Sequence, residues 1–271
     1  MSNASKKINL EQILISPLTG LELKNNSVSY CTNNEEYPVV NNIPVLITKN
    51  DINKYLESEY KLDFKYYKFW DASFIKNLKK KLKIKSGSLL LDIGGGEGFY
   101  SKSFNDLGVN TITADFSKYL LEKGKQNYPM LTFIAADANK IPFSNNTFDT
   151  IFCSGLSSFN TNDLSKCSIL IDHMIDKLKP GGLFIFIHST NLTGKLSHTW
   201  YNISYSDLNH LFRKHKVMHK WFIPRPLVTN ILNQISFSFL SSKFFGFIIK
   251  NLSFIHHKIN GRLIYIIKKD S

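Results

Sequence analysis

The sequence is poor in cysteine and contains no long hydrophobic run. Its three cysteines have no paired spacing, which excludes a disulfide scaffold and a zinc site built from four thiolates. No uninterrupted apolar run reaches the roughly 18 residues of a transmembrane helix. The N-terminus also lacks the basic and then apolar pattern of a signal peptide. We therefore expect a soluble cytoplasmic protein.

Acidic residues are scarce in the last quarter of the chain. Residues 195–271 hold 12 basic and 2 acidic side chains, so this stretch carries most of the net charge of +13. Residues 90–190 are nearly neutral, with 10 acidic and 8 basic side chains. This asymmetry is typical of a surface for RNA or for an anionic membrane, and it equally fits lysine used as an ordinary solvated residue.

The chain has enough apolar material for one α/β domain with a small appendage. Residues 1–50 contain short apolar runs between turns rich in asparagine and proline, which predicts a small β-rich module. Residues 51–87 interleave aromatic and charged side chains, which predicts leading helices. The main domain is expected over residues 88–271, and no internal repeat is evident.

Apolar runs and helical patterns alternate from residue 88 onward, which is typical of a parallel sheet with crossover helices. We predict an α/β fold: a Rossmann-like, mostly parallel, seven-stranded sheet with helices on both faces. The strands are expected at residues 89–93, 110–114, 131–135, 147–153, 183–188, 216–223 and 262–268. The helices are expected at residues 100–107, 117–126, 163–178 and 206–215.

Alternate glycines stand between the first of these strands and the first helix. Gly94, Gly96 and Gly98 leave room for a ligand to approach the backbone, because no Cβ is in the way. The dinucleotide fingerprint Gly-x-Gly-x-x-Gly fails in both registers, since Phe99 and Ser101 occupy its third glycine position. No Gly-Lys-Ser/Thr follows either, so NAD and a phosphate-binding P-loop are both disfavoured.

The segment Leu91-Asp92-Ile93-Gly94-Gly95-Gly96-Glu97-Gly98 resembles motif I of class I S-adenosylmethionine (SAM) dependent methyltransferases, in particular the type 11-like group. Three later features fall in that family's order and spacing. They are Asp115 at the end of the second strand, Ala136-Asp137-Ala138 after the third, and Lys179-Pro180-Gly181-Gly182-Leu183 before the fifth. The resemblance covers residues 88–190 and implies SAM as the cofactor.

The resemblance also assigns roles to the acidic residues. Asp92 is expected near the cationic end of SAM, Asp115 at the ribose hydroxyls and Asp137 at the adenine amine. Taken alone, an aspartate that ends a strand is more often a helix cap, and Asp137 fits an ordinary turn. The expected cofactor-binding residues are Asp92, Gly94, Gly95, Gly96, Gly98, Asp115, Phe116, Asp137, Ala138 and Cys153.

Methyl transfer from a sulfonium rests mainly on alignment and exclusion of water, so a general base is optional. His188 and His198 are the best-placed candidates for a base, although a structural role fits each of them at least as well. Signatures for amino methylation or C5-cytosine methylation of nucleic acid are absent, and Cys153 fits packing beside the cofactor. Candidates for lining the pocket, or for packing in the core, are Tyr66, Tyr67, Trp70, Trp200 and Tyr201.

The N-terminal module resembles small zinc ribbons that precede or partner some methyltransferases. Ser16, Thr19 and Asn34 stand where thiolates are expected, and only Cys31 remains. Because one thiolate cannot hold structural zinc, we predict that the module has no metal and is held by its apolar residues.

Residues 224–260 form a phenylalanine-rich insertion between the last two strands. It fits a pair of packed helices, a lid over a hydrophobic acceptor, or an amphipathic face for peripheral membrane contact.

These features lead to three hypotheses for function. The first is a SAM-dependent methyltransferase that acts on an oxygen or nitrogen atom of a small-molecule, lipid-linked or glycan-linked acceptor in a biosynthetic pathway. An RNA base methyltransferase comes second, favoured by the basic C-terminal stretch. A catalytically silent SAM-fold binding partner comes third, and the intact glycines and acidic anchors disfavour it.

Overall fold

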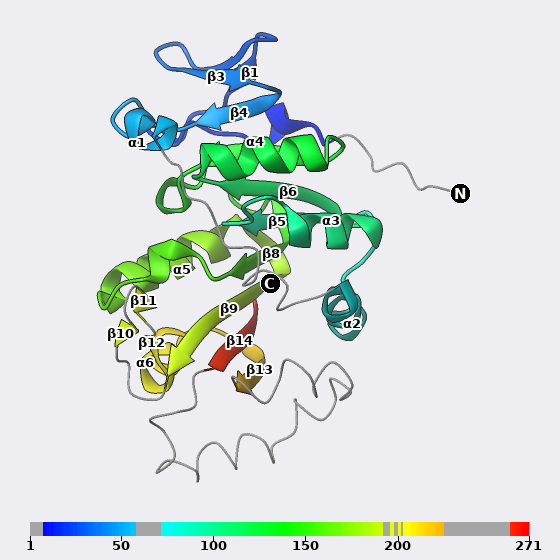
Figure 1. Ribbon diagram of the computed structural model, residues 1–271, viewed down its shortest axis with the longest axis vertical. Helices are drawn as coiled ribbons and strands as arrows, with labels where there is room; N and C mark the ends of the chain where they lie inside the picture. The colour runs from blue at the N-terminus through cyan, green and yellow to red at the C-terminus, as the bar shows by residue number, and fades with distance from the viewer. Residues whose placement is uncertain are drawn as a thin grey trace. The chain divides into compact units, whose positions relative to one another are not determined.

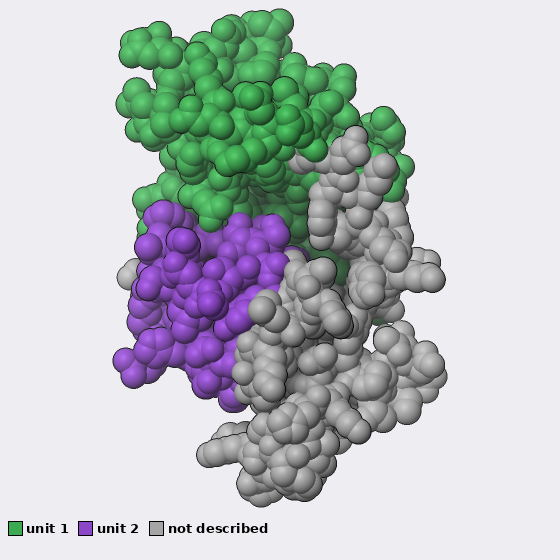
Figure 2. Space-filling view, turned by 60° about the vertical axis from the view of Figure 1, so that its left-hand side comes forward, with its two compact units in different colours: residues 1–152, 176–179 green, residues 153–175, 180–271 purple. Residues whose placement is uncertain are grey.

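The computed structural model describes residues 8–57, 72–191, 196–197, 200–201, 203–224 and 261–270 (Figure 1). The chain divides into two compact units, coloured separately in Figure 2. The first unit contains Met1–Phe152 and Asp176–Lys179, and the second contains Cys153–Ile175 and Pro180–Ser271. His198, Tyr66, Tyr67, Trp70 and residues 225–260 of the expected insertion lie outside the described residues.

The first unit is built on a parallel sheet. Its central strands β5 (Leu89–Ile93), β6 (Asn110–Asp115) and β7 (Thr132–Ala136) lie in the order β7-β6-β5. β8 (Phe148–Ser154), which belongs to this unit as far as Phe152, follows β5. The strands are nearly continuous apolar runs because side chains on both faces of the sheet are buried.

Three helices of the first unit are amphipathic: α2 (Ala72–Leu82), α3 (Phe99–Asp106) and α4 (Lys118–Asn127). α3 contacts β6, and α4 contacts β7 (Figure 1). α4 begins at the expected residue, because the hydroxyl of Ser117 accepts a hydrogen bond from the Leu120 amide at 3.3 Å and so caps the helix.

The N-terminal strands extend this sheet. β1 (Lys24–Asn25), β2 (Ser29–Cys31), β3 (Glu36–Val40) and β4 (Ile43–Leu46) pair in sequence order and antiparallel. Asn41 and Asn42 connect β3 to β4 with φ angles of 52° and 60°, as a tight hairpin of the type I′ class requires. β4 then pairs in parallel with β7, so the β-rich N-terminal segment continues the main sheet.

These N-terminal strands share a core with the α/β part. The buried cluster joins side chains of β4 and of α1 (Ile52–Leu56) to side chains of α4 and β7. The members of the cluster are Ile43, Val45, Ile47, Tyr55, Leu121, Leu131, Phe133 and Ala135. The domain boundaries at residues 50 and 87 stay predictions.

The second unit ends in antiparallel strands. β14 (Gly261–Lys268) pairs antiparallel with β9 (Leu178–Asn191), and β13 (Val217–Pro224) pairs antiparallel with β14. Its described helices are α5 (Leu164–Lys177) and α6 (Tyr205–Leu211). The short elements among the described residues of both units are η1 (Leu10–Gln12), η3 (Ala138–Lys140), η4 (Ser157–Phe159), β10 (Leu196–Ser197), β11 (Trp200–Tyr201) and β12 (Ile203–Ser204).

The predicted fold class is confirmed: the chain has a mixed α/β, Rossmann-like fold. One local feature differs from expectation. Residues 179–182 were expected to form a turn before the fifth strand, but β9 begins at Leu178, directly after α5. Backbone hydrogen bonds from Gly181 to Lys269 and from Lys269 to Gly182, both 3.0 Å, pair this segment with the end of β14, while Gly181 keeps a φ angle of 76° in the left-handed region. No helix in the described ranges is both long and apolar enough to span a bilayer.

Candidate cofactor site

The glycine loop turns sharply between β5 and α3. Gly94, Gly96 and Gly98 have φ angles of 72°, 54° and 79°, in the left-handed region that favours glycine. The amides of Gly94 and Gly95 donate to the Ala114 carbonyl of the neighbouring strand at 2.8 and 3.3 Å. The loop is therefore anchored on β6 and needs glycine for its backbone conformation.

Gly95 is required for a different reason, namely space. A Cβ at this position would lie 2.7 Å from the Thr113 methyl group and 2.8 Å from the carboxyl carbon of Asp92. The loop backbone thus packs directly on the side chain of Asp92, which only a residue without a side chain permits.

Asp92 is a buried carboxyl beneath this loop, with 1% of its surface exposed. Its Oδ2 accepts hydrogen bonds from the Ser101 hydroxyl at 2.9 Å and the Ser101 amide at 3.2 Å. Burial raises the pKa of Asp92 to about 7, the Ser101 hydrogen bonds oppose the rise, and the nearby carboxylate of Asp115 adds to it. The loop therefore rests on an acid that titrates near neutrality.

Asp115, the last residue of β6, is held by backbone amides. Its Oδ2 accepts from Gly96 and its Oδ1 from Ser117, both at 2.8 Å. Burial raises its pKa, and hydrogen bonds from the Ser117, Gly96 and Phe116 amides oppose that rise. A carboxylate has about four acceptor positions, so Asp115 keeps capacity for ligand hydroxyls while its orientation is fixed.

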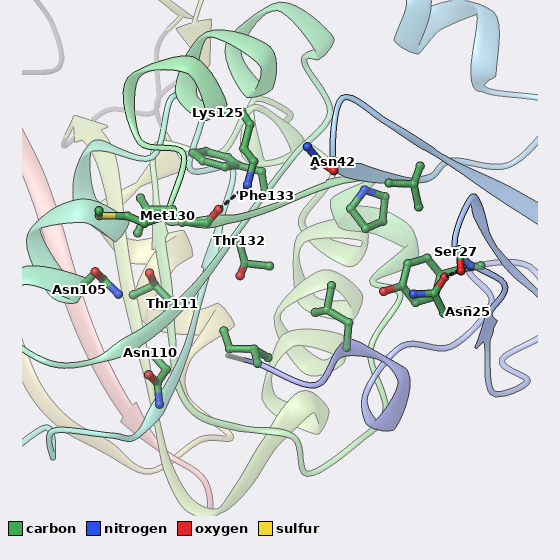
Figure 3. A pocket seen from close by; sticks show the side chains of 16 residues that line it. Asn25, Ser27, Asn42, Asn105, Asn110, Thr111, Lys125, Met130, Thr132 and Phe133 are labelled. Atoms are coloured by element: carbon green, nitrogen blue, oxygen red, sulfur yellow. Dashed lines mark hydrogen bonds between the residues drawn. The ribbon is translucent and has the colours of Figure 1, made fainter. Parts of the chain in front are cut away.

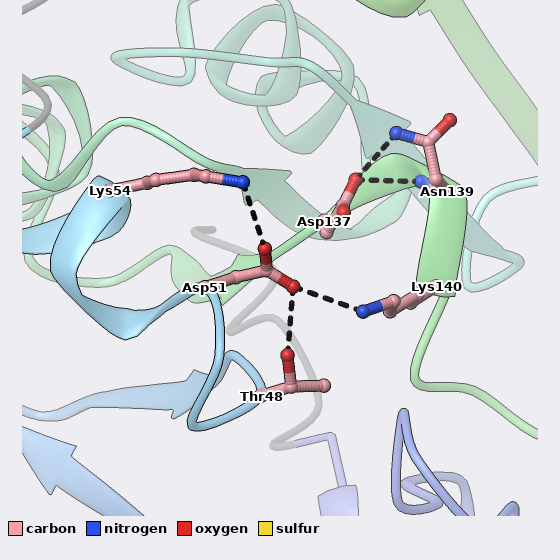
Figure 4. A network of polar contacts seen from close by, with 6 residues as sticks. All are labelled: Thr48, Asp51, Lys54, Asp137, Asn139 and Lys140. Atoms are coloured by element: carbon pink, nitrogen blue, oxygen red, sulfur yellow. Dashed lines mark hydrogen bonds and ion pairs between the residues drawn. The ribbon is translucent and has the colours of Figure 1, made fainter.

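Asp137 follows β7 and caps η3. Its Oδ1 accepts from the backbone amide and the side-chain amide of Asn139, both at 2.8 Å. The turn expected at this position is therefore present, and Figure 4 shows its neighbourhood.

A polar network ties the start of α1 to η3 (Figure 4). Asp51 accepts hydrogen bonds from Thr48 at 2.8 Å, Lys54 at 3.3 Å and Lys140 at 3.0 Å. These interactions, led by that of Lys140, lower the pKa of Asp51 to about 2. The segment after the N-terminal strands is thus fastened beside Asp137.

The structure brings the predicted cofactor residues of the first unit to one edge of the sheet. β5, β6 and β7 are neighbouring parallel strands. The glycine loop and Asp137 follow the carboxyl ends of β5 and β7, and Asp115 is the last residue of β6. Ligands of open α/β sheets bind at that edge. Phe116 lies beside Asp115 with its ring edge-on to Tyr55, the centroids being 6.2 Å apart, and Ala138 is buried.

Sequence reasoning missed Gly124 and the ion pair beside it. A Cβ on Gly124 would lie 2.7 Å from the Glu97 carbonyl oxygen and 2.7 Å from the Phe133 ring, so α4 abuts the glycine loop. Next to it, Lys123 pairs with the Glu97 carboxylate at 2.7 Å. Glycine in a helix interior lowers helix stability by about 1 kcal/mol relative to alanine. A glycine in the middle of the predicted helix was therefore the sequence signal for close packing at this position.

The remaining candidates lie in the second unit. Cys153 is buried, and the imidazole of His188 is fully buried, stacked on Phe186 with ring centroids 5.7 Å apart. Tyr201 donates its backbone amide to the Asn160 side chain, and the Trp200 side chain is outside the described set. The cofactor role of Cys153 and the catalytic role of His188 stay predictions, as does that of His198.

Hydrogen bonds connect the turns of the N-terminal module. The Ser16 hydroxyl accepts from the amides of Leu18 and Thr19 at 3.1 and 3.0 Å and lies 3.1 Å from the Tyr37 hydroxyl. In the opposite turn, Thr32 accepts from the Glu35 amide at 3.1 Å.

The Glu35 carboxylate joins these turns by accepting from Thr19 and Thr32 at 3.0 and 3.5 Å. Glu35 therefore links the second turn to the first, whereas the Cys31 thiol donates to the Lys24 carbonyl at 3.5 Å. In the described part of the chain, no group of three or more His, Cys, Asp or Glu side chains is placed to hold a metal.

A cavity of about 470 Å³ lies at the other end of the strands (Figure 3). Its lining includes the starts of β6 and β7, together with Tyr30 and Pro44 of the N-terminal strands. Asn25, Asn42, Asn105 and Asn110 supply neutral amides. Because it adjoins the amino ends of β6 and β7, it is distinct from the cofactor edge.

Comparisons with known proteins find similarity to methyltransferases. Residues 91–186 match the family described as a methyltransferase domain. The demethylmenaquinone methyltransferase of Paenarthrobacter aurescens is 33% identical over 104 residues, which cover 38% of this chain and 40% of that protein. The malonyl-(acyl-carrier protein) O-methyltransferase of Buchnera aphidicola is 32% identical over 165 residues, covering 58% and 63%. The chain thus spans less than two thirds of the length of these relatives.

Solved structures share the fold. A phosphoethanolamine N-methyltransferase 2 of Haemonchus contortus in complex with S-adenosyl-L-methionine has a TM-score of 0.54 and 19% identity, covering 73% of this chain and 52% of that one. The (4+2)-cyclase SpnF has a TM-score of 0.54 and 14% identity, with coverage of 73% and 81%. Residues 91–186 therefore resemble a methyltransferase domain, and the chain shares the fold of these solved methyltransferase structures.

Proposed function

We propose that this protein is a SAM-dependent methyltransferase of a biosynthetic pathway, with a small-molecule or carrier-linked acceptor. The observation that carries the proposal is the hydrogen bond from Gly96 to Asp115. This bond joins the glycine loop that follows β5 to Asp115 at the end of β6. It places the Asp115 carboxylate beside a stretch of backbone that has no side chains to block a ligand.

Each residue of this edge has a role suited to SAM. Asp115, fixed by two amides, accepts hydrogen bonds from the ribose hydroxyls, and Asp137 receives the adenine amine through the oxygen that does not cap η3. The loop glycines give the ligand close backbone contact. Bound SAM supplies a methyl group on a sulfonium, and the protein contributes alignment and exclusion of water.

The acceptor class is supported by the names of the relatives, which refer to demethylmenaquinone and to a malonyl carrier protein. These names favour a small or carrier-linked acceptor over RNA for this protein. Oxygen and nitrogen stay the predicted target atoms, with His188 or His198 as the proposed base where a proton must be removed.

Calorimetry with SAM tests the cofactor assignment. Wild-type protein is expected to bind SAM, and Asp115→Ala or Gly96→Val is expected to weaken binding at least tenfold. Asp106→Ala is a matched control, because this carboxylate of α3 pairs only with Lys102 among the contacts of the described residues. Absence of SAM binding by the wild type would overturn the proposal.

Catalysis requires a separate test, because the fold is shared with a cyclase. Purified protein is incubated with methyl-labelled SAM and candidate quinone and acyl-carrier acceptors, and label transfer is measured by mass. SAM binding without transfer to any of these acceptors would contradict the proposed acceptor class. Methylation of RNA, together with RNA binding that weakens as salt is added, would instead support the RNA hypothesis.

A further inference from the structure

Three buried side chains behind the glycine loop form a chain of hydrogen bonds. Thr113 of β6 donates to the Ser101 hydroxyl at 2.7 Å, and Ser101 of α3 donates to Asp92 Oδ2 at 2.9 Å. All three are at most 1% exposed. Thr113 therefore fixes the direction of the Ser101 proton, which is left pointing at Asp92.

The same group is in contact with the loop that would hold the cofactor. A Cβ added to Gly95 would lie 2.8 Å from Asp92 Oδ2, so the loop backbone passes close over the carboxylate. A change in the charge of Asp92 therefore acts on the loop at short range, through an interior where charges interact strongly.

The groups around Asp92 do not favour its ionised form. The nearby carboxyl of Asp115 on β6 raises the pKa of Asp92, while the hydrogen-bonded contacts from α3 and β6 are the neutral hydroxyls of Ser101 and Thr113 and the Ser101 amide. Burial without a cationic partner disfavours a carboxylate. A ligand carrying positive charge would supply what is missing.

We propose that Ser101 and Thr113 are positioning residues that orient Asp92 under the glycine loop, and that binding of SAM is coupled to release of the proton of Asp92 to solvent. This inference rests on the proposed function. A cation bound over the loop stabilises the carboxylate, so the ligand binds more tightly once Asp92 has lost its proton.

The direction in which SAM affinity changes with pH follows from the titration of Asp92. The pKa of Asp92 is raised to about 7, so protonated Asp92 predominates at pH 5.5 and the carboxylate at pH 7.5. Affinity for SAM is expected to rise on the order of tenfold over this range, since each pKa unit of coupling corresponds to a factor of ten. Binding below neutral pH should release up to one proton.

The experiment is calorimetry with SAM between pH 5.5 and 7.5, in two buffers of different ionisation enthalpy, so that proton release is counted. Asp92→Asn should remove the rise in SAM affinity with pH. Any pH dependence that remains in this variant comes from titration of the ligand itself. Ser101→Ala removes the hydroxyl hydrogen bond that favours the carboxylate and keeps the one from the backbone amide, so the midpoint should move to higher pH. Thr113→Val should move it in the same direction by less. Ser103→Ala is the control, because its hydroxyl donates to the Phe99 carbonyl instead.

A carbon NMR titration of the Asp92 carboxyl in the ligand-free protein gives a readout independent of binding. It should report a midpoint near neutrality that rises in Ser101→Ala. SAM binding of equal affinity at both pH values, or an Asp92 midpoint near 4, would overturn this inference and leave the proposed function standing. Failure of the wild type to bind SAM at any pH would overturn both.

Discussion

The carbonyl oxygen of Glu97 lies against the α-carbon of Gly124, at a distance that leaves no room for a side chain. A Cβ on Gly124 would meet this oxygen and the Phe133 ring, each at 2.7 Å. Both obstacles are backbone or buried ring atoms, so neither can move aside cheaply. α4 therefore supports the glycine loop by direct contact of main chains.

Gly124→Ala is expected to destabilise the protein and to weaken SAM binding. Alanine in a helix interior normally stabilises by about 1 kcal/mol, but overpacking costs about 1–3 kcal/mol, so the steric effect should win. Urea unfolding and calorimetry measure the two effects. Gln126→Ala, at an exposed site of the same helix, should change stability by no more than about 0.5 kcal/mol. An alanine variant as stable as the wild type would contradict the close contact.

Ser16→Ala is expected to destabilise the N-terminal module. Ser16 is 2% exposed, and its hydroxyl accepts hydrogen bonds from two amides, which alanine would leave without a partner. The loss should be about 1–3 kcal/mol in the free energy of unfolding. The control is Asn33→Ala, at an exposed position of the opposite turn.

Metal analysis of the same purified protein checks the prediction that this module contains no metal. One equivalent of zinc per chain, lost together with stability on chelation, would refute it.

Much of the fold could be predicted because its signals are local in the sequence. The run Leu89–Ile93 and the glycines after it identified β5 and the loop, and Ser117 marked the start of α4. The role of Gly124 was missed because it depends on how closely two elements approach. Likewise, the contact of Asp51 with Lys140 joins residues 89 positions apart, a separation at which periodicity gives no information.

The ion pair of Asp51 with Lys140 predicts acid sensitivity. The folded-state pKa of Asp51 is about 2, below its ordinary value of 3.8, so the stabilisation is present above about pH 4 and is lost as pH falls toward 2. Urea unfolding of the wild type and of Asp51→Asn should therefore differ at pH 6 and converge near pH 2. A difference that persists unchanged at pH 2 would show that the charge of Asp51 is not its cause.

The pairing of β4 with β7 predicts that the N-terminal strands are needed for the first unit to fold. Val45 is 2% exposed and pairs with Ala135, whereas Val40, on the adjacent strand, is 42% exposed. Val45→Asp buries a charge without a partner and should abolish cooperative unfolding, while Val40→Asp should leave it intact. Circular dichroism during heating distinguishes these outcomes.

A chain that begins at residue 51 is expected to aggregate, because it exposes the edge of β7 together with the core under β4. Cooperative folding of that shorter chain would instead support the domain boundary at residue 50.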